Sequence, residues 1–451
     1  MHLRPLLGAA TLALVAALTT SVGSPLGATA PTADSAVSNP VTPGAFRGYG
    51  FDQCLAPNQA AMNAWLRRSP YLAIGIYISG SSRACKVQPN LTKTWVATQL
   101  GAGWKLLAIT LGPQAPCNPR FPRYGNDPVI NNDPGSDGRY AKARRQGSAE
   151  AQKTVTAAAV LGLVPGSTMW YDLEGFDVTN SRCRLASLAF LSAWTRELHA
   201  LHYVSGVYSS AGSGIKMLDD VRVADPTAYH LPDQIWIARW DGIADTNTSY
   251  IRKDGWRPGG RMKQYLGGHN ETWGGVTINV DRDWVGLGTP KAPAETHCNG
   301  LSVDLTDYPR TGPTSDPART KVLQCLLTER KVYAGKVSGV WNTATAAAVT
   351  AWQTKHGLPV RASFGRRAWM TLLSVGSQPI VKLGSTGPTV RDLQRTLDAA
   401  TRGTGLPVSG VFDRATGVAL AAWQKGTHRT ASGVANGGTW AGLQAGERPA
   451  P

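Results

Sequence analysis

Four acidic side chains come at the ends of apolar stretches that have the length of β-strands. Asp52 ends the first stretch (GYGFD), Asp172 and Glu174 end the fourth (MWYDLE), and Asp281 ends the eighth (TINVD). Side chains two positions apart on a strand share a face, so Asp172 and Glu174 can both point into one pocket. Carboxyl groups crowded together raise one another's pKa, so one of them can stay protonated near neutral pH. An acid beside a second carboxylate is what cleavage of a glycosidic bond requires.

A simpler interpretation exists for each acid taken alone. An aspartate at the end of a strand is commonly a helix cap or a turn residue. The set is harder to explain in that way, because one strand carries two acids and all four follow apolar stretches.

Aromatic residues accompany these acids. Tyr77, Tyr208 and Trp236 lie within predicted strands, whereas Trp240 and Tyr265 end the sixth and seventh strands. Sugar rings stack on exposed aromatic faces, but aromatic side chains inside strands are more commonly part of the core. We therefore expect Trp240 and Tyr265 to border a cleft.

The elements that position these residues alternate between strands and helices across residues 46–286. Most of the eight predicted strands are apolar along their whole length, as in parallel sheets buried on both faces. They cover Arg47–Asp52, Tyr71–Ile78, Lys105–Leu111, Thr168–Glu174, Tyr203–Ser209, Gln234–Trp240, Arg261–Tyr265 and Val276–Asp281, with helical patterns at Asn58–Arg68, Leu91–Leu100, Ser148–Leu163 and Leu185–Leu201. This count predicts an α/β fold, a (β/α)8 TIM-like barrel, in which functional residues gather at the C-terminal ends of the strands. A doubly wound open sheet is the alternative.

Other catalytic chemistries have weaker support in the sequence. No G-x-S-x-G motif is present, and His199 and His202 have neither a third ligand nearby nor an H-E-x-x-H context. No nucleotide-binding loop is evident. We expect no metal centre and no cofactor.

The N-terminus has the features of a secretion signal. Arg4 precedes an apolar run, Leu6–Leu18, that is too short to span a membrane, and residues 27–30 (GATA) offer a small-residue cleavage site. We expect residues 1–30 to be a signal peptide, with no transmembrane segment after its removal. A buried N-terminal helix is the alternative.

The composition fits an exported protein made of several domains. The chain has 451 residues and a net charge of +17, and its basic residues are scattered rather than clustered. This distribution favours an anionic cell envelope over nucleic acid as the partner. Segments rich in proline and small residues at 31–45 and 287–296 predict linkers.

Six cysteines are present, and export would allow them to form disulfides. No C-x-x-C pair occurs, and none of the cysteines has the surroundings of a nucleophile. Six cysteines allow 15 connectivities, among which sequential pairing is preferred because each pair would then join neighbouring strand ends. The residues are Cys54, Cys85, Cys117, Cys183, Cys298 and Cys325.

Residues 297–375 and 380–446 contain an internal repeat with a period of 71 residues. The motif VSGV at 337–340 recurs at 408–411, and AWQ at 351–353 recurs at 422–424. Each unit predicts a small all-α domain of three helices. The repeats resemble the peptidoglycan-binding-like domains of bacterial cell-wall hydrolases, and the second copy, with its LGSTG opening at 383–387, matches more fully. The resemblance implies non-covalent attachment to peptidoglycan, and a structural spacer is the alternative.

The barrel region resembles a glycoside-hydrolase-like family of exported proteins from Gram-positive bacteria, first catalogued as a domain of unknown function. The matching stretches are GFDQC at 50–54, QPNL at 88–91, YDLE at 171–174, SGVYSS at 205–210, IARW at 237–240, QY at 264–265 and VD at 280–281. That family is similar in layout to the family 25 lysozyme-type muramidases. The chain departs from those enzymes at Cys54 and in extra loops at residues 112–147.

This likeness implies roles for individual residues. Glu174 would be the general acid, and Asp172 would stabilise the transition state or position the acetamido group of the sugar. Asp52 and Asp281 would complete the acidic cleft. The substrate-binding residues would be Trp240, Gln264, Tyr265, Tyr208 and Tyr77.

The sequence therefore predicts an exported cell-wall protein in which a glycoside-hydrolase-like barrel precedes two wall-binding domains. The expected reaction is hydrolysis of peptidoglycan glycan strands. Two alternatives remain: a non-catalytic protein whose barrel only holds glycan, and a hydrolase of another polysaccharide.

Overall fold

The computed structural model describes residues 38–118, 126–401 and 403–449. The predicted signal peptide and the first part of the predicted linker at 31–45 lie outside these residues. None of the helices in the described ranges is both long and apolar enough to cross a membrane.

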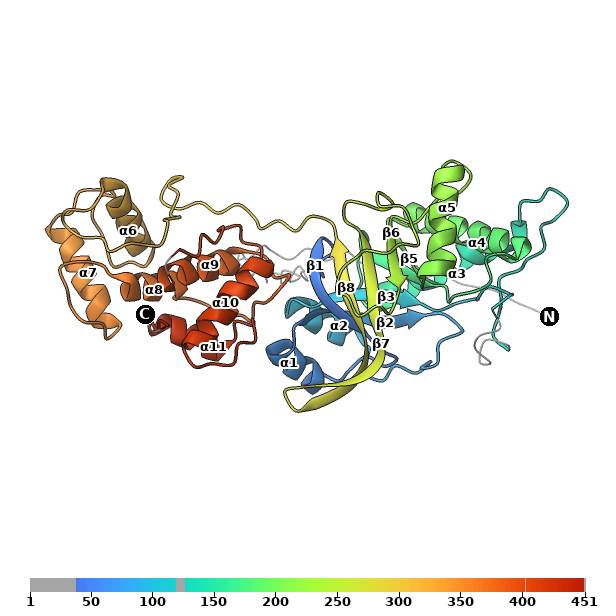
Figure 1. Cartoon of the computed structure of the whole chain (residues 1–451), viewed down its shortest axis with the longest axis horizontal. Helices are drawn as coiled ribbons and strands as arrows, with labels where there is room; N and C mark the ends of the chain where they lie inside the picture. Colours follow the sequence, from blue (N-terminus) through green and yellow to red (C-terminus); the bar gives the residue numbers. More distant parts are fainter. Residues whose placement is uncertain (1–37, 119–125, 402, 450–451) are drawn as a thin grey trace, which may run out of the picture. The chain divides into compact units, whose positions relative to one another are not determined.

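The predicted eight-stranded barrel is confirmed. Its strands close in sequence order, because β1 pairs with both β2 and β8, which rules out the open sheet (Figure 1). The strands are β1 (Phe46–Asp52), β2 (Tyr71–Ser79), β3 (Lys105–Thr110), β4 (Thr168–Asp172), β5 (Val204–Ser210), β6 (Gln234–Ala238), β7 (Gly260–Trp273) and β8 (Val276–Leu287).

Five α-helices connect the first six strands, and a short π-helix (Ala211–Ile215) directly precedes the last of them. The α-helices are α1 (Gln59–Arg68), α2 (Lys93–Gly101), α3 (Ala141–Val160), α4 (Ser181–Ala200) and α5 (Lys216–Ala224). Three of them begin at a polar residue whose side chain accepts a backbone N–H of the first turn, namely Asn58, Thr92 and Asn180. Such caps satisfy donors that a helix leaves unpaired and so fix where the helix starts. Residues 239–259, between β6 and β7, form no helix.

The last strand runs in the direction opposite to the one expected. β7 and β8 form a long antiparallel hairpin that turns at Gly274 and Gly275, and β8 also pairs antiparallel with β1. A two-residue turn cannot reverse the chain into a parallel neighbour, which needs a crossover of a dozen or more residues. Asp281 therefore does not end β8 at its C-terminus. It lies part-way along β8, paired in register with Asp52.

The disulfides pair sequentially, as preferred from the sequence: Cys54–Cys85, Cys117–Cys183 and Cys298–Cys325. The first joins the loop after β1 to the loop after β2. The second joins the segment after β3 to the first turn of α4. Each of these two disulfides thereby links two segments that follow different strands of the barrel.

Two sets of three helices follow the barrel. They are α6 (Pro317–Glu329), α7 (Thr343–Lys355) and α8 (Arg366–Ser374), then α9 (Pro388–Ala400), α10 (Arg414–Gly426) and α11 (Gly437–Gln444). In each set a buried glutamine of the first helix bonds the turn that carries VSGV. Gln324 accepts from the N–H of Gly339 at 2.9 Å, and Gln394 accepts from that of Gly410 at 2.9 Å.

Candidate functional site

A cavity of about 420 Å³ opens at the barrel end where β4 and β6 finish, and we call it the acidic chamber. Eight of the nine predicted site residues line it: Asp52, Tyr77, Asp172, Glu174, Tyr208, Trp240, Gln264 and Asp281. They come from β1, β2, β5, β7 and β8 and from the segments at the ends of β4 and β6. The barrel thus gathers into one cavity residues that lie far apart in the sequence.

Tyr265 is the exception, and its predicted place in the cleft is wrong. Its side chain is buried, and its surroundings include Tyr49 and Arg282 rather than the cavity residues. Successive side chains of a strand point to opposite faces. Because Gln264 points into the chamber, Tyr265 must point away from it.

Gln264 connects three of the other residues. Its Nε2 donates to Oδ2 of Asp52 at 2.9 Å. Its Oε1 accepts from the hydroxyl of Tyr208 and from Nε1 of Trp240, both at 2.9 Å. A buried amide with three good partners has one favourable orientation, so this glutamine fixes the positions of an acid, a phenol and an indole together.

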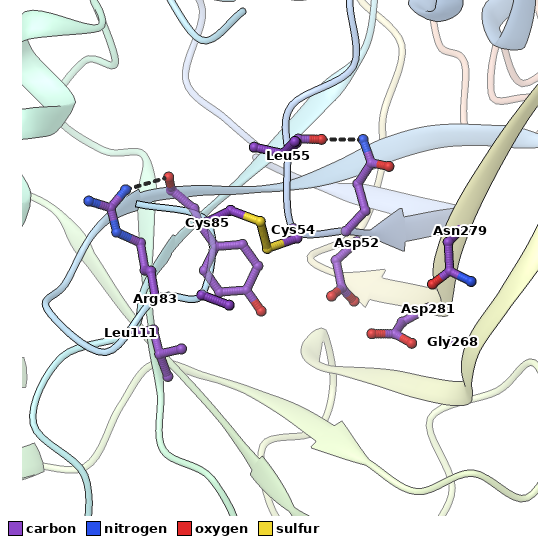
Figure 2. A pocket seen from close by; sticks show the side chains of 12 residues that line it. Asp52, Cys54, Leu55, Arg83, Cys85, Leu111, Gly268, Asn279 and Asp281 are labelled. Carbon is purple, nitrogen blue, oxygen red and sulfur yellow. Dashed lines mark hydrogen bonds between the residues drawn. A yellow bond between two sulfur atoms is a disulfide. The ribbon is translucent and has the colours of Figure 1, made fainter. Parts of the chain in front are cut away.

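Asp52 and Asp281 face one another across the β1–β8 pair, as Figure 2 shows. Burial raises the pKa of Asp52 well above its usual range, and the nearby charge of Asp281 adds to the rise. Burial also raises the pKa of Asp281, to about 6, where His269 opposes the rise and Glu174 supports it. This end of the chamber therefore retains protons at a pH where exposed aspartates are ionised.

The backbone leaves room for Asp52 through a glycine on the neighbouring strand. A Cβ placed on Gly75 of β2 would lie 2.5 Å from Cβ of Asp52. Any side chain there would push Asp52 out of its position beside Gln264.

Asp283 lies near Asp52 and Asp281 and was not predicted from the sequence. It is fully buried on β8, and its Oδ1 accepts from Nε1 of Trp236 at 2.9 Å. Burial, and then the charges of Asp52 and Asp281, raise its pKa well above the usual range. The spacing D-x-D at 281–283 is the same signal that paired Asp172 with Glu174.

Gln114 is a second missed residue, and it braces the end of β4. Its Nε2 donates to the carbonyl of Asp172 at 2.9 Å, and its Oε1 accepts from the N–H of Glu174 at 2.9 Å. Gln114 belongs to the extra loop at 112–147. No described residue of that loop lines the acidic chamber. Through Gln114 the loop instead fixes the main chain of Asp172 and Glu174.

Two tyrosines border the acids. The hydroxyl of Tyr77 is 3.4 Å from Oδ2 of Asp172, and that of Tyr208 bonds Gln264. Burial, and then the nearby carboxylates, raise the pKa of both phenols well above the usual range. Both therefore remain neutral hydrogen-bond donors throughout the physiological pH range.

Trp240 forms an exposed aromatic surface at the rim, with 64% of its area accessible. Its ring lies against Gly267 of β7, where an added Cβ would come within 2.7 Å of the indole. The loop behind it is tied down by buried Lys263, whose Nζ lies 3.1 Å from Asp241 and 2.7 Å from Asp245. An exposed indole held in a fixed position is suited to stacking on a sugar ring.

Metal-type ligands gather in one place among the described residues, at Cys298, Cys325 and Glu329. The two sulfurs there are bonded to each other, so they supply no thiolate ligand. The acidic chamber instead combines clustered carboxyl groups, neutral phenols and an aromatic surface. This arrangement can protonate a leaving oxygen and stabilise positive charge on a bound sugar.

Comparison with known protein families finds one family model that matches most of the barrel region. Residues 63–285 match the family model of the Rv2525c-like, glycoside hydrolase-like domain. The barrel is therefore similar to a glycoside-hydrolase-like domain, and the C-terminal helices lie outside the matched residues. No curated protein matches the chain significantly.

The solved structures found by structural comparison have low sequence identity to the chain. An uncharacterised protein of B. stearothermophilus and the Tat-secreted protein Rv2525c of Mycobacterium tuberculosis, solved with L-tartrate, each have 14% identity and a TM-score of 0.34. These alignments cover 52% and 53% of this chain, respectively, and 95% of each of those chains. The Cpl-1 endolysin, complexed with a peptidoglycan analogue, has 14% identity and a TM-score of 0.30, over 56% of this chain and 57% of its own.

Proposed function

We propose that this protein is an exported cell-wall glycoside hydrolase that cleaves the glycan strands of peptidoglycan. The observation that carries the proposal is the acidic chamber, where four carboxyl groups line one cavity beside an exposed indole. Hydrolysis of a glycosidic bond needs a protonated acid and a second carboxylate on the two sides of the bond. A chamber of crowded carboxyl groups can supply both states at one pH.

Glu174 is the general acid in this proposal. It follows the end of β4 and is only partly buried, so a bound glycosidic oxygen can reach it. Asp172 stabilises the oxocarbenium-like transition state or positions the acetamido group. Asp52 and Asp281 line the same cavity and complete the acidic cleft.

Trp240, Gln264, Tyr208 and Tyr77 bind the sugar. The indole offers a stacking face, and the two phenols offer hydroxyl donors. Because Gln264 bonds Asp52, Tyr208 and Trp240 at once, a displacement of the stacking face would be transmitted to Asp52.

The two helical domains serve as the anchor. Their support is the 71-residue repeat and the resemblance to wall-binding domains. Truncation after about residue 290 should leave a folded barrel that no longer sediments with cell-wall sacculi. Undiminished sedimentation of the truncated protein would remove the anchoring role.

The decisive experiment incubates the purified full-length protein with cell-wall sacculi and measures new reducing ends. Glu174→Gln removes the transferable proton and nearly preserves the shape of the side chain, so hydrolysis should fall by about 10²–10⁴-fold while glycan binding persists. Asp172→Asn should also reduce turnover, because it removes a charge placed near the developing cation. Equal turnover by Glu174→Gln would refute its role as the acid.

The same experiment distinguishes the alternatives. If the wild type binds glycan but releases no reducing ends from sacculi or chitin, the barrel is a carbohydrate-binding domain. If it cleaves only another polysaccharide, the helical domains bind one polymer and the barrel hydrolyses a different one.

A further inference from the structure

The acidic chamber continues into a second cavity of about 470 Å³, which we call the arginine chamber. The two share Asp52, Tyr77 and Asp281, so they are parts of one cleft. The arginine chamber lies between the loops that follow β1 and β2 on one side and the β7–β8 hairpin on the other. The side chains around it are shown in Figure 2, and they include Arg83, Cys54, Cys85, Leu55, Leu111 and Asn279.

The two chambers differ in the charged side chains that line them. Four carboxyl groups line the acidic chamber. The arginine chamber shares two of them, Asp52 and Asp281, and adds the one basic side chain among all described residues that line either cavity. That side chain is Arg83. In Figure 2 it lies on the far side of the Cys54–Cys85 disulfide from the carboxyl groups of Asp52 and Asp281.

Arg83 is held in place by main-chain carbonyls. Its Nε donates to the carbonyl of Gly80 at 2.9 Å, and its Nη1 donates to that of Tyr77 at 3.2 Å. Among the ion pairs of the described residues, none involves Arg83. A guanidinium has five N–H donors, so donors remain for a ligand, and the two groups that hold Arg83 in place are neutral carbonyls.

The loop that carries Arg83 is fixed to the loop that follows Asp52. The disulfide Cys54–Cys85 joins them, and Gln88 bonds both sides. Its Nε2 donates to the carbonyls of Cys54 and Cys85 at 2.7 and 3.2 Å, and its Oε1 accepts from the N–H of Ala56 at 3.0 Å. The cation is therefore held at a set position relative to Asp52, which reduces the entropy that ligand binding costs.

We propose that the arginine chamber receives a carboxylate carried by a substituent of the glycan chain, such as a peptide attached to a sugar, and that Arg83 selects it. This inference rests on the proposed function, because it assigns the substrate of the same cleft. Carboxylates favour a fixed guanidinium, with which they form charge-assisted hydrogen bonds. A guanidinium in this chamber alone therefore places the substituent that carries the carboxylate on the Arg83 side of the cleft.

The test compares three soluble ligands by calorimetric titration of the full-length protein carrying Glu174→Gln, which should slow turnover enough for binding to be measured. One is the disaccharide of N-acetylglucosamine and N-acetylmuramic acid bearing a dipeptide with free carboxylates. The second is the same molecule with its carboxylates amidated, and the third is a neutral oligomer of N-acetylglucosamine. We expect the free acid to bind about ten-fold more tightly than the amide, as one charge-assisted contact provides.

Further substitution of Arg83 should abolish this preference. Arg83→Gln keeps an amide that can donate to the carbonyls of Gly80 or Tyr77 but removes the charge, so only the free acid should lose affinity. Arg83→Lys should retain part of the preference. Lys86→Gln is the matched control, because Lys86 is exposed on the same loop but does not line the chamber. Added salt should weaken the preference without changing the affinity of the amide.

The outcomes separate the two proposals. If no ligand binds the protein with Arg83 intact, the proposed function fails and this inference fails with it. If free acid and amide bind equally, or if the Arg83→Gln protein keeps the preference, Arg83 does not select a carboxylate while the proposed function stands. An equal loss with Lys86→Gln would assign the preference to the general charge of the loop.

Discussion

Replacing Asp281 with asparagine should make the protein more stable at neutral pH. Burial raises the pKa of Asp281 from 3.8 to about 6. Between these values the folded protein keeps a proton that the unfolded chain has released. The contribution of this group to stability is therefore complete below pH 3.8 and is lost as the pH rises through 6.

The size of the effect follows from the difference between the two pKa values. A difference of about two units, at about 1.4 kcal/mol each, corresponds to roughly 3 kcal/mol near pH 7. At pH 4 the same calculation gives about 0.5 kcal/mol, because the folded protein keeps its proton and the unfolded chain, close to its own pKa, has released only part of its own. Asp281 keeps some contact with solvent, so we expect Asp281→Asn to gain about 1–3 kcal/mol at pH 7 and almost nothing at pH 4.

The assay is urea denaturation of the full-length protein at both pH values, followed by tryptophan fluorescence. Asp177→Asn is the control, because hydrogen bonds with Thr179 hold the pKa of that exposed aspartate below its usual range. Its substitution should bring no gain at pH 7. The reasoning is refuted if Asp281→Asn is less stable than the wild type at pH 7, or if its gain is the same at pH 4.

Three further predictions concern other residues. Asp283→Asn should keep the stability of the barrel at pH 7, whereas Asp283→Ala should cost about 1–3 kcal/mol by leaving Nε1 of Trp236 unpaired; equal denaturation midpoints for the two variants would show that the hydrogen bond to Trp236 does not stabilise the barrel. Trp240→Ala should weaken binding of a neutral oligosaccharide about ten-fold without lowering the thermal midpoint by more than about 1 °C, and calorimetric titration would measure unchanged affinity if the indole were not a stacking surface. Thiol titration of the denatured, non-reduced protein should find no free cysteine, because all six are paired; two or more free thiols would contradict the disulfide framework.

Much of the barrel could be predicted because its strands are strongly apolar and separated by recognisable helices. Stretches such as YLAIGIYI in β2 are buried almost throughout, and only Tyr77 near its end is partly exposed. The direction of β8 could not be inferred from apolar content, because a strand has the same composition whichever way it runs. The Gly274–Gly275 turn was the available signal, since it is too short for a crossover.

Residue composition alone also does not show which face of a strand a side chain occupies or which main-chain groups it contacts, and this explains the residues that were misplaced or missed. Tyr265 was assigned to the cleft from its position at a strand end, although alternation with Gln264 puts only one of the two on the inner face. Asp283 was missed because an antiparallel β8 brings the middle of the strand, rather than its C-terminus, to the acids. Gln114 acts through main-chain contacts from a loop, and such contacts leave no pattern in residue type.

The antiparallel pairing of β1 with β8 has a mechanical consequence. Phe46 at the start of β1 is paired with Leu287 at the end of β8, and the register runs without interruption to Asp52 and Asp281. Tension on the segments that precede β1 and follow β8 would therefore pull on Phe46 and Leu287, which lie at the same end of the β1–β8 pair. Hydrogen bonds between these strands would then break one after another from that end, instead of sharing the load as in a sheared pair. The last ones to break would be those beside Asp52 and Asp281, so a barrel pulled from both flanks would keep its acids together until its seam had almost fully separated.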